Sequence, residues 1–132
     1  MLSKRNASNM TWLTVADGSR LCELLHPLCT SGLPMRCSIA VAELQPKQAN
    51  ALHRLRESTE IFYILSGTGT IRIDDELQPV VSGDAVVVPP GAWQCLENNG
   101  TELLRFLCIC DPAWHADDEE VEQPHPKSGV FE

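Results

Sequence analysis

The chain has 132 residues, of which 43% are hydrophobic and 21% are charged, and its formal net charge is −8 at pH 7. A chain of this length folds as one domain whose core needs neither metal nor disulfide staples. The negative charge disfavours nucleic acid and anionic membrane surfaces as partners, and no apolar stretch is long enough to cross a bilayer. The N-terminus lacks a hydrophobic signal segment, so we expect a cytoplasmic protein.

Short β-prone runs separated by turn residues follow one another along the chain, a pattern typical of an antiparallel sandwich or barrel. Residues 20–25 fit a strand or a helix equally well. The strands expected after them are residues 36–44, 60–65, 70–74, 77–81, 85–88, 93–98 and 103–110. The sequence therefore predicts one all-β domain.

The same reading divides this domain into three parts. Residues 1–35 are expected to form N-terminal strands or an extension that packs on the barrel, and residues 36–110 are expected to form the barrel itself. Residues 111–132 contain three prolines and the acidic run 117–120. We expect them to form an irregular or short helical C-terminal extension, with the acidic run as a solvated tail.

Six cysteines raise the question of disulfides or zinc. In a reducing compartment they are best interpreted as small, inert core residues. A zinc site built from Cys108, Cys110 and His115 lacks any recognised ligand spacing, so we do not expect one.

Two segments contain a spaced set of polar residues, glycines and prolines. In residues 53–67 the set is His53, Glu60 and Gly67. In residues 83–98 it is Gly83, Pro89, Gly91 and Asn98, with Gln94 between the last two. The three glycines fall where strands must reverse direction, a task that needs a positive φ or a close backbone approach.

These two segments resemble the two motifs of the cupin family, and the resemblance covers residues 36–110. It implies a cupin jelly-roll β-barrel, or double-stranded β-helix, of the small mannose-6-phosphate isomerase-like or RmlC-like type. Three positions depart from the pattern. Lys47 stands where the leading Gly would be, Leu55 replaces the second His of the first motif, and Gln94 replaces the His of the second.

Strand alternation supports an interior site. His53 and Leu55 share one face of a strand, opposite Arg54, and Glu60 shares its face with Phe62. A carboxylate among apolar neighbours is costly to bury unless a metal ion or a hydrogen-bond network satisfies it. The residues therefore indicate a polar site inside the barrel.

The resemblance assigns chemistry to this site. Cupins typically hold a divalent metal with three His and one Glu, which implies metal ligands at His53, Glu60 and Gln94, with Mn, Fe, Ni or Zn as the ion. Glu60 could instead be catalytic, as a base. The alternative is a metal-free pocket in which Gln94 hydrogen-bonds Glu60 or His53, because the loss of two imidazoles weakens metal binding.

Several functions follow from this site. One is a metal-dependent enzyme acting on a small sugar or organic acid by isomerisation or epimerisation, dioxygenation or lyase chemistry, and no residue selects among these reactions. Another is a module that binds such a small-molecule ligand without turnover, which Leu55 favours. A third is an oligomeric protein with a vestigial site. We also expect a homodimer, because sheet edges need protection, with Trp12 and Leu13 as contributors.

Overall fold

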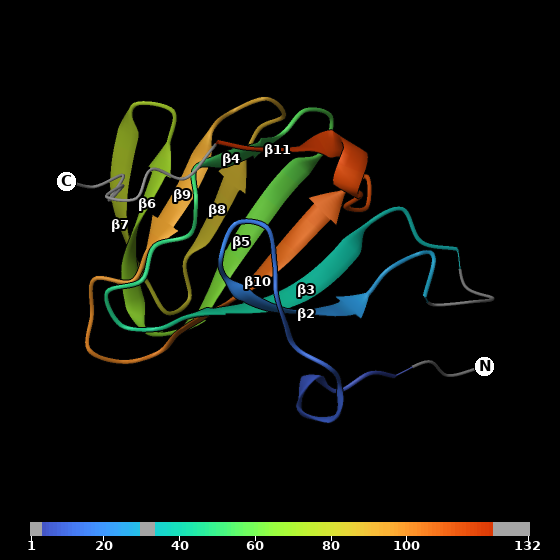
Figure 1. Cartoon of the computed structure of the whole chain (residues 1–132), viewed down its shortest axis with the longest axis horizontal. Helices are drawn as coiled ribbons and strands as arrows, with labels where there is room; N and C mark the ends of the chain where they lie inside the picture. Colours follow the sequence, from blue (N-terminus) through green and yellow to red (C-terminus); the bar gives the residue numbers. More distant parts are fainter. Residues whose placement is uncertain (1–3, 30–33, 123–132) are drawn as a thin grey trace.

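The computed structural model describes residues 4–29 and 34–122, which fold into two antiparallel sheets (Figure 1). The first sheet has the order β1 (Leu13–Thr14), β2 (Arg20–Leu25), β3 (Ser38–Leu44), β10 (Leu104–Asp111), β5 (Thr59–Ser66) and β8 (Ala85–Val88). The second has the order β11 (Glu119–Val121), β4 (His53–Leu55), β9 (Gln94–Glu97), β6 (Thr68–Ile73) and β7 (Glu76–Val81). Two short 3₁₀ helices, η1 (Ala7–Asn9) and η2 (Ala116–Asp118), complete the described elements. The all-β prediction is confirmed.

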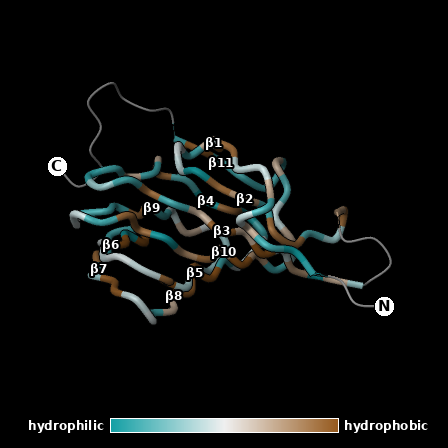
Figure 2. Tube along the Cα trace, turned by 90° about the horizontal axis from the view of Figure 1, so that it is seen from below, coloured by the Kyte–Doolittle hydropathy of each residue, from teal (hydrophilic) through white to brown (hydrophobic). Residues whose placement is uncertain are grey.

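Alternating side chains build the core between the sheets. In β10, buried and half-buried residues alternate from Leu104 to Cys110, as a strand with one face toward the core requires. Figure 2 shows the corresponding change between hydrophobic and hydrophilic colours along the strands. Phe62 of β5 packs edge-on against Phe106 of β10, with ring centroids 5.7 Å apart. Burying each such side chain contributes about 1.5–3 kcal/mol.

The turn at Gly67, between β5 and β6, shows why one motif glycine is needed. Gly67 has φ 89°, a conformation that L side chains rarely adopt. A Cβ atom there would lie 2.6 Å from the carbonyl oxygen of Leu103. The strand reversal therefore requires glycine both for its backbone angle and for the close approach of the β9–β10 connection.

The structure settles one expectation that the sequence left open and corrects two others. Residues 20–25, left open between strand and helix, form β2, which pairs with β3. Residues 119–121 were expected in an irregular or helical extension, but they form β11, which pairs with β4 and adds an edge strand to the second sheet. Asp118, in the acidic run expected to be a solvated tail, is only 3% exposed. Residues 123–132 of the expected extension lie outside the described residues.

Four of the six cysteines are buried as expected, while Cys37 is half-buried and Cys29 is exposed. All six are free, and the buried ones are Cys22, Cys95, Cys108 and Cys110. Burial raises the pKa of the Cys95 thiol to about 12, so this thiol stays protonated and inert at neutral pH.

The N-terminal segment packs on the first sheet through Trp12. The guanidinium groups of Arg20 and Arg105 both lie over the Trp12 ring, with their carbons 5.3 and 5.5 Å from the ring centroid. Leu13, next to it in the edge strand β1, is 61% exposed. In the described residues, no helix is both long and apolar enough to cross a membrane.

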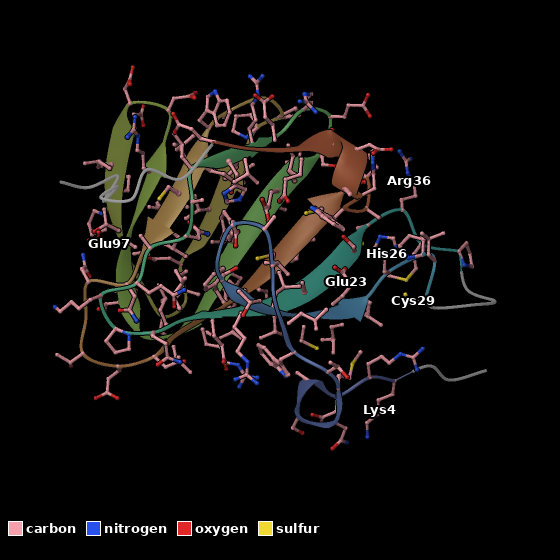
Figure 3. The ribbon with its side chains drawn as sticks, in the orientation of Figure 1. Lys4, Glu23, His26, Cys29, Arg36 and Glu97 are labelled. Carbon is pink, nitrogen blue, oxygen red and sulfur yellow. The ribbon has the colours of Figure 1, made fainter. Side chains whose placement is uncertain are left out.

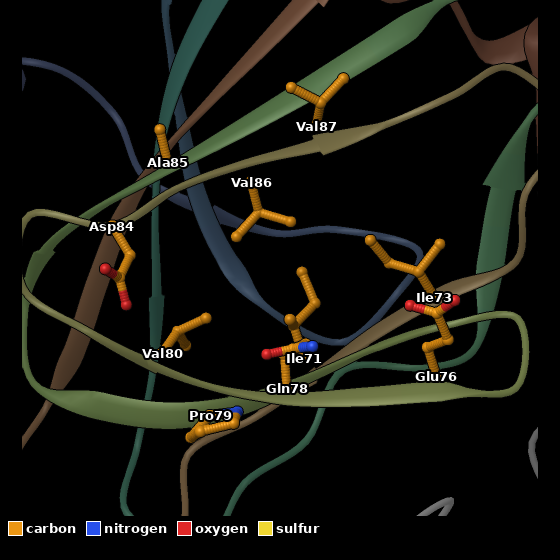
Figure 4. A pocket seen from close by; sticks show the side chains of 10 residues that line it. All are labelled: Ile71, Ile73, Glu76, Gln78, Pro79, Val80, Asp84, Ala85, Val86 and Val87. Carbon is orange, nitrogen blue, oxygen red and sulfur yellow. The ribbon is translucent and has the colours of Figure 1, made fainter.

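At the opposite end of the sheets, the edge strands β7 and β8 leave a groove of about 460 Å³ (Figure 4). Its floor is apolar, with Ile71, Val80 and Val86, and Glu76 and Asp84 lie at its margins. None of the residues predicted to form the interior site lines this groove.

Candidate functional site

Strand β4 directs His53 into the interior. His53 and Leu55 are 4% and 3% exposed, while Arg54 points outward and stacks on Trp93, 4.7 Å from the ring centroid. The His53 Nδ1 atom lies 2.7 Å from the carbonyl oxygen of Ala51. Because a carbonyl oxygen only accepts hydrogen bonds, Nδ1 carries the proton and donates it. Nε2 of His53 is therefore the nitrogen available to a metal ion or an acid.

Glu60 and Gln94 meet in the same interior. They come from β5 and β9, are 7% and 1% exposed, and the Gln94 Nε2 atom donates a hydrogen bond of 2.8 Å to Glu60 Oε1. Gln94 also lies directly across from His53 in the β4–β9 pair. The structure thus brings the three predicted site residues together.

Burial raises the pKa of the Glu60 carboxyl to about 7, although the nearby His53 and the hydrogen bond from Gln94 both act to lower it. The Gln94 Oε1 atom is buried and has no hydrogen-bond partner. A buried amide oxygen without a partner is uncommon and costly, so this oxygen marks a place where a ligand is expected.

Sequence reasoning missed Asp17, which reaches the site from the turn between β1 and β2. Asp17 Oδ2 lies 3.7 Å from Nε2 of His53. The backbone carbonyl of Asp17 accepts a hydrogen bond of 2.6 Å from the amide of Ala51, two residues before His53. The sequence signal was a turn-forming Asp-Gly pair at residues 17–18, which predicts a reversal but gives no indication of what the turn covers.

Glu119 is the other residue that sequence reasoning missed. It lies opposite Leu55 in the β11–β4 pair. Burial raises the pKa of the Glu119 carboxyl, with a further contribution from the charge of Asp17, while His53 and a hydrogen bond from Trp114 act against this rise. Because β11 was not expected as a strand, no pattern pointed to Glu119.

Asp118 holds the loop between His53 and Glu60. Its carboxylate accepts hydrogen bonds from the backbone amides of Glu57 at 2.7 Å and Ser58 at 3.1 Å. Potential ligand atoms of Glu57, His115 and Asp118 also lie within 4.8 Å of one another, near the surface. His115 is thus placed beside two carboxylates.

The residues present fit a divalent metal ion. The interior offers an imidazole nitrogen, a buried carboxylate and an amide oxygen without a partner, and such nitrogen and oxygen donors suit Mn, Fe, Ni and Zn. A positive ion would also offset the cost of burying Glu60. Leu55, 3% exposed beside His53, offers no donor, so any such ion would have fewer imidazole ligands than the motif implies.

Comparison with known proteins places this site in a family. The model of the cupin domain matches residues 40–110, a range that includes His53, Glu60 and Gln94. An uncharacterized protein of Methanocaldococcus jannaschii is 35% identical over 105 residues, which are 80% of this chain and 82% of that protein. The oxalate-binding protein of Thermotoga maritima is 28% identical over 88 residues, 66% of this chain and 73% of that protein. The 5-aminosalicylate 1,2-dioxygenase of a Comamonas species is 32% identical over 69 residues, but these are only 18% of its length.

Solved structures share the fold. A crystal structure from Thermotoga maritima, described as a "predicted oxalate decarboxylase", has a TM-score of 0.73 at 23% identity and covers 83% of this chain and 99% of that one. Pac13, a nucleoside dehydratase from Streptomyces, has a TM-score of 0.73 at 15% identity and covers 93% of this chain and 92% of that one. At these identities the likeness concerns the fold alone, and it agrees with the expected jelly-roll barrel. Together with the match to residues 40–110, it shows that this chain belongs to the cupin family.

Proposed function

We propose that the barrel interior binds a divalent transition metal through His53, Glu60 and Gln94, and that the bound metal receives a small organic acid or another small polar metabolite. The observation that carries the proposal is the unpartnered, buried Oε1 atom of Gln94 beside the buried carboxylate of Glu60. The third ligand would be His53, because its Nδ1 atom bonds to the backbone and leaves Nε2 for the metal.

The negative charge of the interior indicates that an organic acid would bind only together with the metal ion. Asp17, Glu60 and Glu119 place three carboxyl groups around one imidazole, and in the absence of a cation these groups repel an anionic ligand. A metal ion would reverse that preference. The relative named as an oxalate-binding protein is consistent with a small carboxylate as the ligand.

A bound divalent ion would supply Lewis acidity that polarises a carbonyl or carboxylate of the ligand. The residues of the chain would do the rest. Ala51, through its carbonyl, fixes the tautomer of His53, and Gln94 orients the Glu60 carboxylate. If the bound ligand is converted to a product, the protein is an isomerase, epimerase, dioxygenase or lyase; if it is not, the protein is a binding module. In an enzyme, Glu60 would be the residue that accepts a proton.

Metal analysis of protein purified without chelator tests the proposal. We expect about one transition metal ion per chain in the wild type and little in Glu60→Gln. Glu122→Gln, which removes one exposed carboxylate, is the matched control and should keep its metal. Titration with oxalate should then show binding to the metal-loaded protein only.

A metal-free binding module is the second candidate, and the specific observation in its favour is Leu55, which removes a donor from the interior. A wild type without metal, whose melting temperature is unchanged by EDTA, would support this candidate against the first.

Two further expectations remain predictions, a homodimer and a cytoplasmic location. The exposed Leu13 in the edge strand β1 is a suitable contact for a second copy. Light scattering coupled to size-exclusion chromatography tests the dimer, and a monomeric mass would refute it.

A further inference from the structure

Asp17 and Glu119 lie outside both cupin motifs, yet the fold brings them to His53 and Glu60. One comes from the turn before β2 and the other from the last described strand, β11. The charges of both act on Glu60, and the charge of His53 acts on both Glu60 and Glu119. These four ionisable groups are therefore electrostatically coupled and are called the interior cluster below; within it, Asp17 Oδ2 lies 3.7 Å from His53 Nε2.

The turn holding Asp17 is fixed from several directions. Within it, the amide of Val15 donates to Ser19 and the amide of Gly18 donates to Val15, with N···O distances of 3.0 and 2.9 Å. The side chain of Gln48 donates to the carbonyl of Gly18 at 2.8 Å, which ties the turn to the segment before β4. The turn is therefore positioned relative to His53 and does not hang free.

The carboxylate of Asp17 is oriented as well as placed. Its Oδ1 atom accepts from the amide and the hydroxyl of Ser19, at 2.9 and 2.6 Å. This arrangement leaves Oδ2 directed inward, 3.4 Å from the Asn50 side-chain nitrogen and 3.7 Å from His53 Nε2. An oxygen with only one weak hydrogen bond that faces the free nitrogen of an imidazole is suitably placed to share a cation with it.

Glu119 lies where the motif has lost a ligand. It is directly opposite Leu55 in the antiparallel β11–β4 pair. Residues directly opposite one another in such a pair project from the same face of the sheet. Glu119 therefore projects from the same face as Leu55, the residue that stands in place of the second His.

The Gln94 amide gives an independent indication that a ligand belongs here. Its Nε2 donates to Glu60, whereas its Oε1 has no hydrogen-bond partner although Gln94 is 1% exposed. Three carboxylates around a single imidazole leave an excess of negative charge at low exposure. Either a cation or protons must offset it.

We propose that Asp17 and Glu119 are two further ligands of the divalent cation, so that the site holds it with three carboxylates, one imidazole and the Gln94 amide oxygen. This inference rests on the proposed function, since it presupposes that the barrel binds a metal. Such an oxygen-rich set shifts preference from Zn²⁺ toward Mn²⁺. The carboxylates of Asp17 and Glu119 would then replace the two imidazoles that the motif loses at Leu55 and Gln94.

Calorimetric titration of chelator-treated protein with Mn²⁺ tests the inference. Asp17→Asn and Glu119→Gln should each weaken Mn²⁺ binding by about tenfold or more, because each replaces a charged carboxylate by a neutral amide, a weaker donor. Glu122→Gln, the same change in charge at an exposed position next to β11, should bind within about twofold of the wild type.

Melting curves separate ligation from a structural role. Without metal, Asp17→Asn and Glu119→Gln should be at least as stable as the wild type, because each removes a repelling carboxylate. With Mn²⁺, their gain in melting temperature should be smaller than that of the wild type. Variants that are less stable without metal but gain as much from Mn²⁺ as the wild type would overturn the inference.

The titrations also distinguish failure of the inference from failure of the proposed function. If Glu60→Gln abolishes Mn²⁺ binding while Asp17→Asn and Glu119→Gln bind like Glu122→Gln, the metal site stands and the two extra ligands are wrong. If the wild type binds neither Mn²⁺ nor Zn²⁺, both proposals are wrong, and protons offset the negative charge of the cluster.

Discussion

Substitution of Asp118 should destabilise the fold and the site together. The Asp118 carboxylate is buried and accepts hydrogen bonds from two backbone amides, those of Glu57 and Ser58. These amides lie in the loop that joins β4, which holds His53, to β5, which holds Glu60. No water can easily replace the carboxylate, because Asp118 is only 3% exposed.

The magnitude follows from those two contacts. A hydrogen bond to a charged group contributes about 1.5–3 kcal/mol, so Asp118→Ala should lower the free energy of unfolding by about 3–6 kcal/mol. Asp118→Asn keeps one carbonyl oxygen and turns an amide donor toward the other N–H, so it should cost about half as much or more. Because whole domains are stable by about 5–15 kcal/mol, the alanine variant should be near the limit of folding.

Urea unfolding measures the effect, and Asp117→Ala is the matched control. Asp117 is the exposed neighbour in η2, and it contacts Arg56 through its backbone carbonyl, which the substitution keeps. We expect the control to lie within about 0.5 kcal/mol of the wild type. Equal unfolding free energies for Asp118→Ala and Asp117→Ala would refute the claim that this carboxylate holds the loop.

Three other perturbations have definite outcomes. Leu55→His should tighten Mn²⁺ or Zn²⁺ binding by about tenfold, or about 1.4 kcal/mol, by restoring an imidazole beside His53. A calorimetric affinity no higher than that of the wild type would show that a side chain at position 55 does not reach the metal. Glu23 lies near His26 at the end of β2 (Figure 3), and burial raises the pKa of its carboxyl group. Its contribution to the free energy of unfolding is therefore present below the pKa of the unfolded state and is lost as the pH rises through the pKa of the folded state. Glu23→Gln should therefore be more stable than the wild type at pH 7 and equal to it near pH 4, and melting curves showing the same difference at both pH values would contradict this reasoning. Gly67→Ala should cost more than Gly83→Ala, for which only the positive φ costs about 1–2 kcal/mol because a Cβ there meets open space; equal losses in urea unfolding would mean that the close approach to Leu103 is relieved at no cost.

Most of the barrel could be predicted because its signals are local. Alternation of apolar and polar residues marks the strands from β3 to β10, and turn residues mark their ends. The motif spacing also predicted that His53, Glu60 and Gln94 would lie together, on three different strands. In the structure these residues belong to β4, β5 and β9.

The sequence by itself determined the β character of the chain, the positions of its strand reversals and the motif residues that face inward, because alternation and turn chemistry act between neighbours in the chain. Only the tertiary structure decided that β11 pairs with β4 and that Asp17 and Glu119 join His53. The segments that meet there are distant in sequence, as are Ser58 and Asp118, which are 60 residues apart. Pairing across such distances depends on which sheet edge is free and which turn can cover it, and no local pattern of residues contains that information.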